Sequence, residues 1–265
     1  MKLTVIGGGN MGGAIVRGLV QGSIFQARDI TVVDINDAPL NALKAFNPDI
    51  QTARGDYESL RSADIALLAV KPWLMENVLM EIKDLLDYSK QIIVSIAAGI
   101  TIDTINKTLL KPFGVPQFPT VFRLIPNTAI SVRQSITLIS EKNANKEQIQ
   151  LLLQIFNELG CAVVIDESKM EAGTALTSCG IAYFFRYVRA ATLAGVEMGF
   201  RPQEAQNLVV KTMLGAACLL DETQQDPESE IDKVTTPGGI TIKGLNELEA
   251  NGFSNAVIKA LKASK

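Results

Sequence analysis

The sequence predicts an α/β domain built on a parallel sheet, followed by an all-α domain. Through the first 165 residues short apolar runs alternate with helical patterns, whereas after Ile165 only helical periodicity remains. Short strands separated by helices are typical of right-handed βαβ units and a parallel sheet. We therefore expect one domain over residues 1–165 and a second domain over residues 166–265.

Each element of the first domain is expected from its own pattern. The strands are apolar runs, in chain order LTVI, ITVVD, IALLAV, IIVSIAAG, FPTVFRLIPN, SITLIS and CAVVI. The helices show helical patterning and are MGGAIVRGLVQG, PLNALKAF, MENVLMEIKDLL, TIDTINKTL and EQIQLLLQIFNELG. Strands and helices alternate through most of this segment, as crossover connections between parallel strands require.

The second domain is expected to be helical and to need a partner. One apolar helix face is formed by Ala205, Leu208, Val209, Thr212, Met213, Ala216 and Leu219. The segment AGTALTSCGIAYFF is apolar nearly all round, which indicates burial on several sides. Because so small a domain offers little cover for such a helix, we expect a second subunit to cover it.

Composition excludes several classes of function. The 265 residues are 47% hydrophobic and 20% charged, as in globular proteins rather than disordered chains. The net charge is −3 and no basic run occurs, so nucleic acid is not an expected partner. The longest uncharged stretches, Leu3–Val16 and Ala172–Phe185, are too short to span a membrane, and the N-terminus lacks a secretory signal pattern. We expect a cytoplasmic protein.

The chain contains no histidine and three cysteines, Cys161, Cys179 and Cys218. The missing imidazole excludes Ser-His and Cys-His nucleophilic catalysis and imidazole base catalysis. It also disfavours a zinc site, and no metal is expected. Because the cysteines are odd in number and far apart, we expect reduced, buried thiols rather than a disulfide framework, and Cys179 is interpreted as a small core residue rather than a nucleophile.

A glycine motif follows the first strand. Gly7, Gly9 and Gly12 form G-x-G-x-x-G where a strand turns into a helix, and Asp34 ends the second strand 22 residues after Gly12. The first glycine permits a tight turn, the second lets a pyrophosphate approach, and the third allows close packing of helix and strand. A purely structural turn is the alternative, but strand, turn, helix and acid together predict a Rossmann-like dinucleotide-binding domain.

Asp34 also bears on the choice of cofactor. A carboxylate at this position accepts hydrogen bonds from the ribose hydroxyls of NAD and repels a 2′-phosphate. Asn36 and Asp37 follow, with no arginine or lysine beside them to hold that phosphate. The cofactor is therefore expected to be NADH or NADPH, with NADH favoured. The alternative is a solvated loop acid beside a site that takes either cofactor.

Four further motifs resemble those of one family. LAVKP (68–72), SIAAG (95–99) and RLIPNTA (123–129) each end a strand, where ligands bind in open α/β folds, and TTPGGITIKGL (235–245) lies near the C-terminus. With the glycine motif, their order and spacing resemble the pyrroline-5-carboxylate reductase family over essentially the whole chain.

The resemblance implies a reaction, an assembly and a set of cofactor residues. The reaction is hydride transfer from NAD(P)H to the carbon–nitrogen double bond of 1-pyrroline-5-carboxylate, giving proline. The assembly is a homodimer interlocked through the C-terminal helices, with rings of dimers in some members. The cofactor residues would be Gly7, Gly9, Asn10, Met11, Gly12, Asp34, Val70, Lys71 and Pro72, with Ala97 and Ala98 beside the nicotinamide.

The TTPGGITIKGL segment is expected to bind the substrate. A helix N-terminus offers unpaired N–H groups to a carboxylate, and Gly238 and Gly239 let the backbone close on a small ring. We expect the Thr236 hydroxyl to bind the carboxylate and Thr241 to reach the imine nitrogen, with Val234 completing the substrate site. The alternative is that Thr235 or Thr236 merely caps the helix and the glycines form a turn.

Thr241 is the expected catalytic residue. It is too weak an acid to protonate the imine itself, but an iminium that arrives protonated needs positioning and charge complementarity, for which a hydrogen-bonding hydroxyl or a relay from water suffices. Lys71 is interpreted as part of a backbone turn over the nicotinamide rather than as a catalytic acid. Substrate roles for Tyr183, Arg186 and Arg189 are weaker alternatives.

Two further interpretations compete with this one. Family members carry S-G-S-G-P-A where Thr177–Ala182 reads TSCGIA, which changes the expected helix geometry and leaves open a reductase of another cyclic imine. A 3-hydroxyacid dehydrogenase would use an acid such as Lys169, but it leaves TTPGGITI unexplained. A non-catalytic dinucleotide-sensing protein would be expected to lose the threonines and glycines at 236–241, and this chain keeps them.

Overall fold

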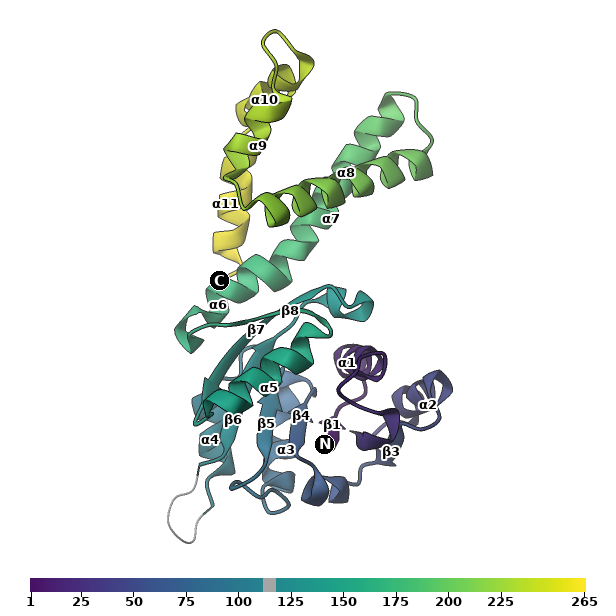
Figure 1. Ribbon diagram of the computed structural model, residues 1–265, viewed down its shortest axis with the longest axis vertical. Helices are drawn as coiled ribbons and strands as arrows, with labels where there is room; N and C mark the ends of the chain where they lie inside the picture. The colour runs from purple at the N-terminus through teal and green to yellow at the C-terminus, as the bar shows by residue number, and fades with distance from the viewer. Residues whose placement is uncertain (112–117) are drawn as a thin grey trace. The chain divides into compact units, whose positions relative to one another are not determined.

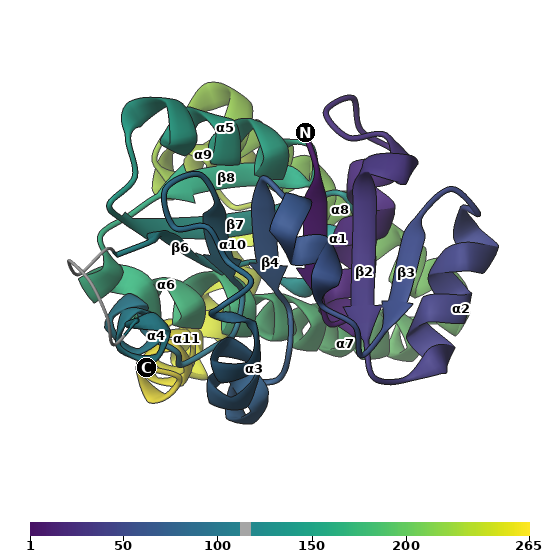
Figure 2. The ribbon, with the colours of Figure 1, turned by 90° about the horizontal axis from the view of Figure 1, so that it is seen from below.

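The computed structural model describes residues 1–111 and 118–265, which form two compact units, Met1–Ser178 and Cys179–Lys265. The first unit is built on an eight-stranded sheet in the order β3-β2-β1-β4-β5-β6-β7-β8 (Figures 1 and 2). Its strands are β1 Leu3–Ile6, β2 Ile30–Asp34, β3 Gln51–Arg54, β4 Ile65–Leu68, β5 Ile92–Ser95, β6 Thr120–Ile125, β7 Ser135–Lys142 and β8 Gly160–Val164.

Helices cover both faces of this sheet. They are α1 Asn10–Val20, α2 Asp37–Phe46, α3 Met75–Ile82, α4 Ile102–Leu109, α5 Lys146–Asn157 and the short α6 Met170–Thr174. Side chains of α1, α2 and α5 pack into one large hydrophobic cluster with the sheet, and those of α3 and α4 pack into another. This two-faced burial explains why every residue of β1, β4 and β5 is buried, instead of buried and exposed positions alternating along the strand.

The prediction of an α/β fold with a helical second domain is confirmed, with two differences in the sheet. β7 runs antiparallel to β6, whereas every other neighbouring pair is parallel. The strand β3 was not expected, because its sequence QTAR lacks an apolar run. β3 lies at an edge of the sheet, where side chains remain solvated and hydrophobic pattern gives little signal.

The second unit consists of helices alone among the described residues. They are α7 Gly180–Glu197, α8 Pro202–Thr223, α9 Pro227–Val234, α10 Ile240–Ala250 and α11 Phe253–Ala263. Only Gly180, Thr192, Gly195 and Ala205 are buried within them in the single chain. Large apolar side chains such as Phe184, Phe185 and Leu208 are more than half exposed. A single copy of this unit therefore has almost no core of its own.

The cysteines are free but are less buried than expected. Cys161 and Cys218 are exposed and Cys179 is partly buried, so the prediction of buried thiols is wrong for the first two. Cys161 lies on the edge strand β8 and Cys218 lies on the little-covered helix α8. Among the helices that the structure describes, none has the length and apolar character that a bilayer crossing requires.

Candidate functional site

The turn between β1 and α1 is fixed by contacts with the neighbouring strand. Gly7 has φ of +103°, and a Cβ built on it would lie 2.7 Å from the carbonyl oxygen of Ala69, which follows β4. A Cβ on Gly12 would lie 2.0 Å from the carbonyl oxygen of Gly7. Ala69 in turn donates its N–H to Ile6 at 2.8 Å. The fold itself therefore requires Gly7 and Gly12, whatever binds there.

Gly9 differs, because no contact with the described residues requires it to be glycine. Its φ of −63° and ψ of −163° are open to any residue, and a Cβ there would meet no atom within 4 Å. Gly9 is the N-cap of α1, which no side chain of the described residues caps and whose first turn carries no acid. The uncapped N–H groups and the space left by the missing side chain fit a pyrophosphate, so the residues present suit a dinucleotide.

Asp34 is held firmly at the end of β2. One carboxylate oxygen accepts the N–H of Gly8 at 2.8 Å, and the other accepts the N–H of Asn36 at 2.9 Å. Burial raises the pKa of the nearby Tyr57 phenol, and the carboxylates of Glu81 and Asp34 raise it further. The Asp34 carboxylate thus lies beside the glycine turn with a fixed orientation, as a ribose-binding acid must.

A basic side chain does lie beside this acid, contrary to the prediction. The parallel register pairs Asp34 with Arg54 at the end of β3. Arg54 Nη1 donates to Asp37 Oδ2 at 2.8 Å, and its Nε donates to the carbonyl oxygen of Ile35 at 3.3 Å. Arg54 was missed because its strand was missed. Arg54 can be found only by knowing that the end of β3 pairs with the end of β2, and the sequence around Asp34 does not contain that information.

The Val70-Lys71-Pro72 segment follows β4 and turns back immediately. The Lys71 carbonyl oxygen accepts the N–H of Leu74 at 2.9 Å, closing a 3₁₀ turn over Pro72–Leu74. Lys71 Nζ lies 6.0 Å from the ring centroid of Trp73, and Lys71 is exposed. The lysine therefore serves the turn through its backbone, while its amine faces an exposed aromatic ring.

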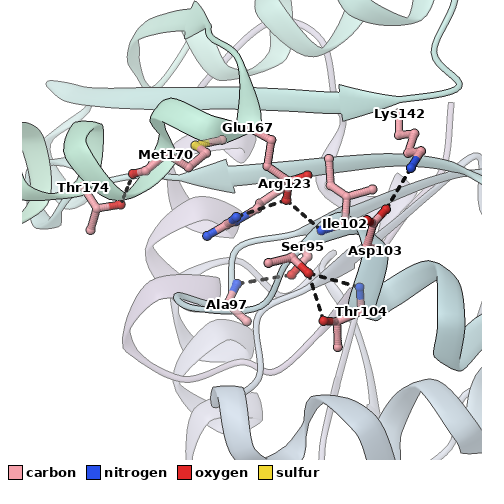
Figure 3. A network of polar contacts seen from close by, with 11 residues as sticks. Ser95, Ala97, Ile102, Asp103, Thr104, Arg123, Lys142, Glu167, Met170 and Thr174 are labelled. Atoms are coloured by element: carbon pink, nitrogen blue, oxygen red, sulfur yellow. Dashed lines mark hydrogen bonds and ion pairs between the residues drawn. The ribbon is translucent and has the colours of Figure 1, made fainter. Parts of the chain in front are cut away.

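Ala97 and Ala98 follow β5 and differ in exposure. Ala97 is buried and donates its N–H to the Ser95 hydroxyl at 3.3 Å, whereas Ala98 is exposed (Figure 3). The small side chains leave the backbone free to approach a flat ligand ring. Gly9, Asp34, Val70 and Ala97 thus all follow the C-terminal ends of the adjacent parallel strands β1, β2, β4 and β5, and the structure brings this group together.

Near this loop lies a partly buried ion pair that sequence analysis missed. Arg123 on β6 is 6% exposed, and its Nη1 donates to Glu167 Oε1 at 3.0 Å. The same carboxylate oxygen accepts the N–H of Ile102 at 2.8 Å (Figure 3). Glu167 therefore connects β6 to the start of α4, the helix that begins directly after the Ala97–Ala98 loop. Its acidic residue is distant in sequence from both partners, so no local motif reveals the pair.

The Pro126-Asn127 motif contacts the segment that departs from the family pattern. Asn127 Nδ2 donates to the carbonyl oxygen of Thr177 at 3.2 Å, and the Ser178 hydroxyl donates to that of Pro126 at 3.1 Å. Residues Ala175–Cys179 form a π-helical turn between α6 and α7. The helix is therefore irregular at Ala175–Cys179, which overlaps the segment Thr177–Ala182 where the sequence departs from the family pattern.

The threonine–glycine segment forms the connection between α9 and α10. Gly238 has φ of +73°, and Gly239, the N-cap of α10, donates its N–H to the carbonyl oxygen of Thr236 at 2.9 Å. No described side chain caps α10, and the Thr235 hydroxyl bonds back to Ile231 in α9. Of the alternative interpretation, the threonine cap on α10 is absent among the described residues, whereas the turn at the glycines is present.

The expected substrate residues share this turn. Val234 ends α9, Thr236 and Gly238 lie in the connection, and Thr241 lies in the first turn of α10, all of them exposed. An uncapped helix start with two hydroxyls and no acid in its first turn can bind a small anion. This group belongs to the second unit and the cofactor group belongs to the first.

Comparison with known families matches both units. Residues 167–265 match the family model described as pyrroline-5-carboxylate reductase dimerisation. Residues 2–99 match the model described as NADP oxidoreductase coenzyme F420-dependent. The dimerisation match covers the helices whose apolar side chains are exposed in the single chain.

Individual relatives that match over almost the whole chain are named pyrroline-5-carboxylate reductase. The pyrroline-5-carboxylate reductase of Methanosarcina acetivorans is 35% identical, with 100% of this chain and 97% of that protein covered. Pyrroline-5-carboxylate reductase 1 of Dictyostelium discoideum is also 35% identical over 99% of this chain, which spans 48% of that longer protein.

Solved structures of similar proteins share this fold. The pyrroline-5-carboxylate reductase of Coxiella burnetii has a TM-score of 0.89 at 32% identity, covering 99% of this chain and 95% of the other. The Plasmodium falciparum pyrroline carboxylate reductase, solved with NADP bound, has a TM-score of 0.85 at 26% identity, covering 100% and 95%.

Proposed function

Because this chain belongs to the pyrroline-5-carboxylate reductase family, we propose that it reduces 1-pyrroline-5-carboxylate to L-proline, the last step of proline biosynthesis. The observation that carries the proposal is the match over the full chain, which includes the uncapped, threonine-flanked start of α10. A dinucleotide-sensing role is not favoured, since it gives that segment no purpose.

The first unit holds the cofactor in this proposal. When bound, the nicotinamide dinucleotide supplies the hydride. The open space at Gly9 and the first turn of α1 take the pyrophosphate, and Asp34 takes the ribose hydroxyls. The full cofactor set is Gly7, Gly9, Asn10, Met11, Gly12, Asp34, Val70, Lys71, Pro72, Ala97 and Ala98. NADH is the favoured cofactor, because a fixed carboxylate at Asp34 repels a 2′-phosphate.

The α9–α10 connection holds the substrate. The free N–H groups at the start of α10 and the Thr236 hydroxyl bind the ring carboxylate, while Gly238 and Gly239 keep side chains out of the way. Val234 contributes an apolar surface to the ring. The carboxylate is thereby oriented by donors that α10 cannot satisfy within itself.

Thr241 acts on the imine nitrogen. Its hydroxyl holds the proton of the iminium, or passes a proton from water, and so fixes the orientation in which the imine carbon accepts a hydride. No stronger acid is required, because the positive charge of the iminium itself favours hydride addition. Lys71 has no part in the proton transfer, in keeping with its exposed amine beside Trp73.

The assembly and location complete the proposal. Residues 1–165 form the cofactor domain, and residues 166–265 form a domain that pairs two copies into a homodimer, which fits the exposed apolar faces of α7 and α8. An isolated dimer and a ring of dimers, the latter implied by the resemblance for some members only, are the two assemblies to distinguish, and the cytoplasm is the expected compartment.

Initial rates test this function. Purified protein is mixed with 1-pyrroline-5-carboxylate and either NADH or NADPH, and the loss of nicotinamide absorbance is followed. We expect oxidation of both, faster with NADH. Thr241→Ala should lower kcat at least ~10-fold with little change in the KM for NADH, whereas Thr241→Ser, which keeps the hydroxyl, should retain most activity. Equal activity in Thr241→Ala would remove Thr241 from the mechanism.

A further inference from the structure

Arg54 is placed where it can choose between cofactors. It ends β3 directly opposite Asp34, the acid that meets the ribose in the proposed function on which this inference rests. Its guanidinium contacts the carbonyl oxygen of Ile35, in the loop that follows Asp34, and Asp37, the first residue of α2. A single arginine thus lies across the segment that receives the adenosine end of a dinucleotide.

The contacts of Arg54 are weak enough to be exchanged. The Arg54 side chain is 66% exposed and that of Asp37 is 56% exposed. An exposed pair of this kind contributes little to stability, so separating it costs little. A phosphate offers a guanidinium two charge-assisted hydrogen bonds in its preferred fork geometry. Arg54 can therefore leave Asp37 for a 2′-phosphate when one is present.

The charges around Asp34 determine whether this site favours a phosphorylated or an unphosphorylated ribose. Asp34 and Asp37 carry two negative charges and Arg54 carries one positive charge, which leaves the cluster acidic and favours the unphosphorylated ribose. Asp37 is also the first residue of α2, whose N-cap Asn36 makes no side-chain capping bond. The N–H groups of that turn can assist an anion once the Asp37 charge is reduced.

We propose that Arg54 and Asp37 form a cofactor selector. With NADH, Arg54 stays on Asp37, and Asp34 binds the ribose hydroxyls. With NADPH, Arg54 turns from Asp37 to the 2′-phosphate and offsets the repulsion from Asp34. Binding of NADPH therefore depends on Arg54 and is opposed by Asp37, while binding of NADH depends on neither.

Direct binding separates this selector from the enzymatic activity. Trp73 is the single tryptophan of the chain, is 75% exposed, and follows the Val70–Pro72 segment. Its emission overlaps the absorbance of reduced nicotinamide, so quenching reports binding of NADH and NADPH without turnover. Calorimetry with 2′,5′-ADP and with 5′-AMP, which lack the nicotinamide, isolates the adenosine end.

Three full-length variants test the proposal. Arg54→Gln should weaken NADPH and 2′,5′-ADP about 10-fold or more, as loss of a phosphate-binding arginine does, and change NADH and 5′-AMP less than about twofold. Asp37→Asn should tighten NADPH severalfold. The control Arg61→Gln, which removes another exposed arginine paired with Glu58, should change neither cofactor.

The outcomes distinguish the selector from the proposed function. If the wild type binds NADH but Arg54→Gln weakens NADH and NADPH equally, or weakens neither, the selector is wrong while the reductase proposal stands. If Asp37→Asn weakens NADPH, the opposing role of Asp37 is wrong and the selector falls with it. A wild-type chain that binds neither dinucleotide overturns both proposals.

Discussion

Helices α1 and α10 both begin at a glycine-rich turn, and neither has a side-chain cap from the described residues. At α1 a Cβ on Gly7 would meet the backbone of Ala69 across the sheet, and a Cβ on Gly12 would meet both the Gly7 carbonyl oxygen and the Ala69 side chain. At α10 the nearest atoms to a Cβ on Gly239 belong to Thr236 of the same turn, and a Cβ on Gly238 meets nothing within 4 Å.

The difference indicates what each turn needs in order to work. The α1 turn is held in place by contacts with Ala69 at the end of the neighbouring strand, all within the first unit. The α10 turn is shaped only by its own backbone and lies on a unit with almost no core, so its final environment depends on what binds or packs there. The first is a property of the fold, and the second is a property of the assembled enzyme.

The largest expected effect comes from adding a methyl group at the α1 turn. Gly12→Ala should lower the free energy of unfolding by about 3 kcal/mol, since the new carbon lies 2.0 Å from a backbone oxygen that cannot move away. Gly238→Ala should cost only about 1 kcal/mol, for the left-handed backbone alone. Urea unfolding at one protein concentration measures both variants.

The comparison has a functional counterpart at Gly9. Gly9→Ala should keep wild-type stability, as its Cβ meets no atom of the described residues, and should lose affinity for both dinucleotides in the Trp73 quenching assay.

The stability comparison between Gly12→Ala and Gly238→Ala has its own contradicting outcome. If Gly12→Ala proves as stable as wild type, or Gly238→Ala is the more damaging change, then the sheet does not hold the α1 turn as argued.

The next effect concerns the ion pair of Arg123 and Glu167, near the Ala97–Ala98 loop. Glu167→Gln leaves the Arg123 guanidinium buried without a charged partner, and should destabilise the protein by about 2 kcal/mol, less than for a fully buried pair because Glu167 is a third exposed. The matched change Glu58→Gln in the exposed pair with Arg61 should cost below about 0.5 kcal/mol. Equal costs for the two variants would contradict an anchoring role for Glu167.

The smallest effect is a dependence on alkaline pH at Tyr88, also in the cofactor unit. Burial raises the pKa of Tyr88 to about 12, with a further contribution from Asp84, and its hydroxyl donates to the carbonyl oxygen of Leu109 at 2.6 Å. The folded state thus favours the protonated phenol. Its contribution is fully present below the unfolded pKa of 10.0 and is lost as pH rises toward about 12.

Tyr88→Phe provides the measurement. The variant should be about 1 kcal/mol less stable than wild type near neutral pH, because it lacks the hydrogen bond. The difference between the two proteins should shrink by about 1 kcal/mol between pH ~9 and pH ~12, as only the wild type must then keep a phenol protonated or bury a phenolate. A difference that stays constant over this range would show that Tyr88 titrates normally.

Much of the fold could be predicted because its buried strands have a clear apolar sequence pattern. β1, β4 and β5 are buried on both faces, and their sequences are mostly apolar, with one small hydroxyl residue each in β1 and β5. β3 was missed because QTAR has neither an apolar run nor alternation, and the reversed direction of β7 was missed because the sequence of a strand does not encode the direction of its neighbour.

The candidate site divides in the same way. Gly7, Gly12 and Asp34 could be assigned from sequence because the turn, its packing and the acid lie on consecutive elements. Arg54 and the Arg123–Glu167 pair could not, since each depends on which strands become neighbours. Gly9 lies in the glycine turn, as expected. Only the structure shows that a side chain at this position would contact none of the described residues.

The polarity of β3 has a consequence for solubility. β3 is an edge strand, and an edge presents unpaired N–H and C=O groups to which another chain can add. Its length of four residues, its polar composition and the charge of Arg54 at its end all discourage such growth. The features that hid this strand from hydrophobic pattern therefore protect the sheet from aggregation, and replacing Arg54 with an apolar residue would remove part of that protection.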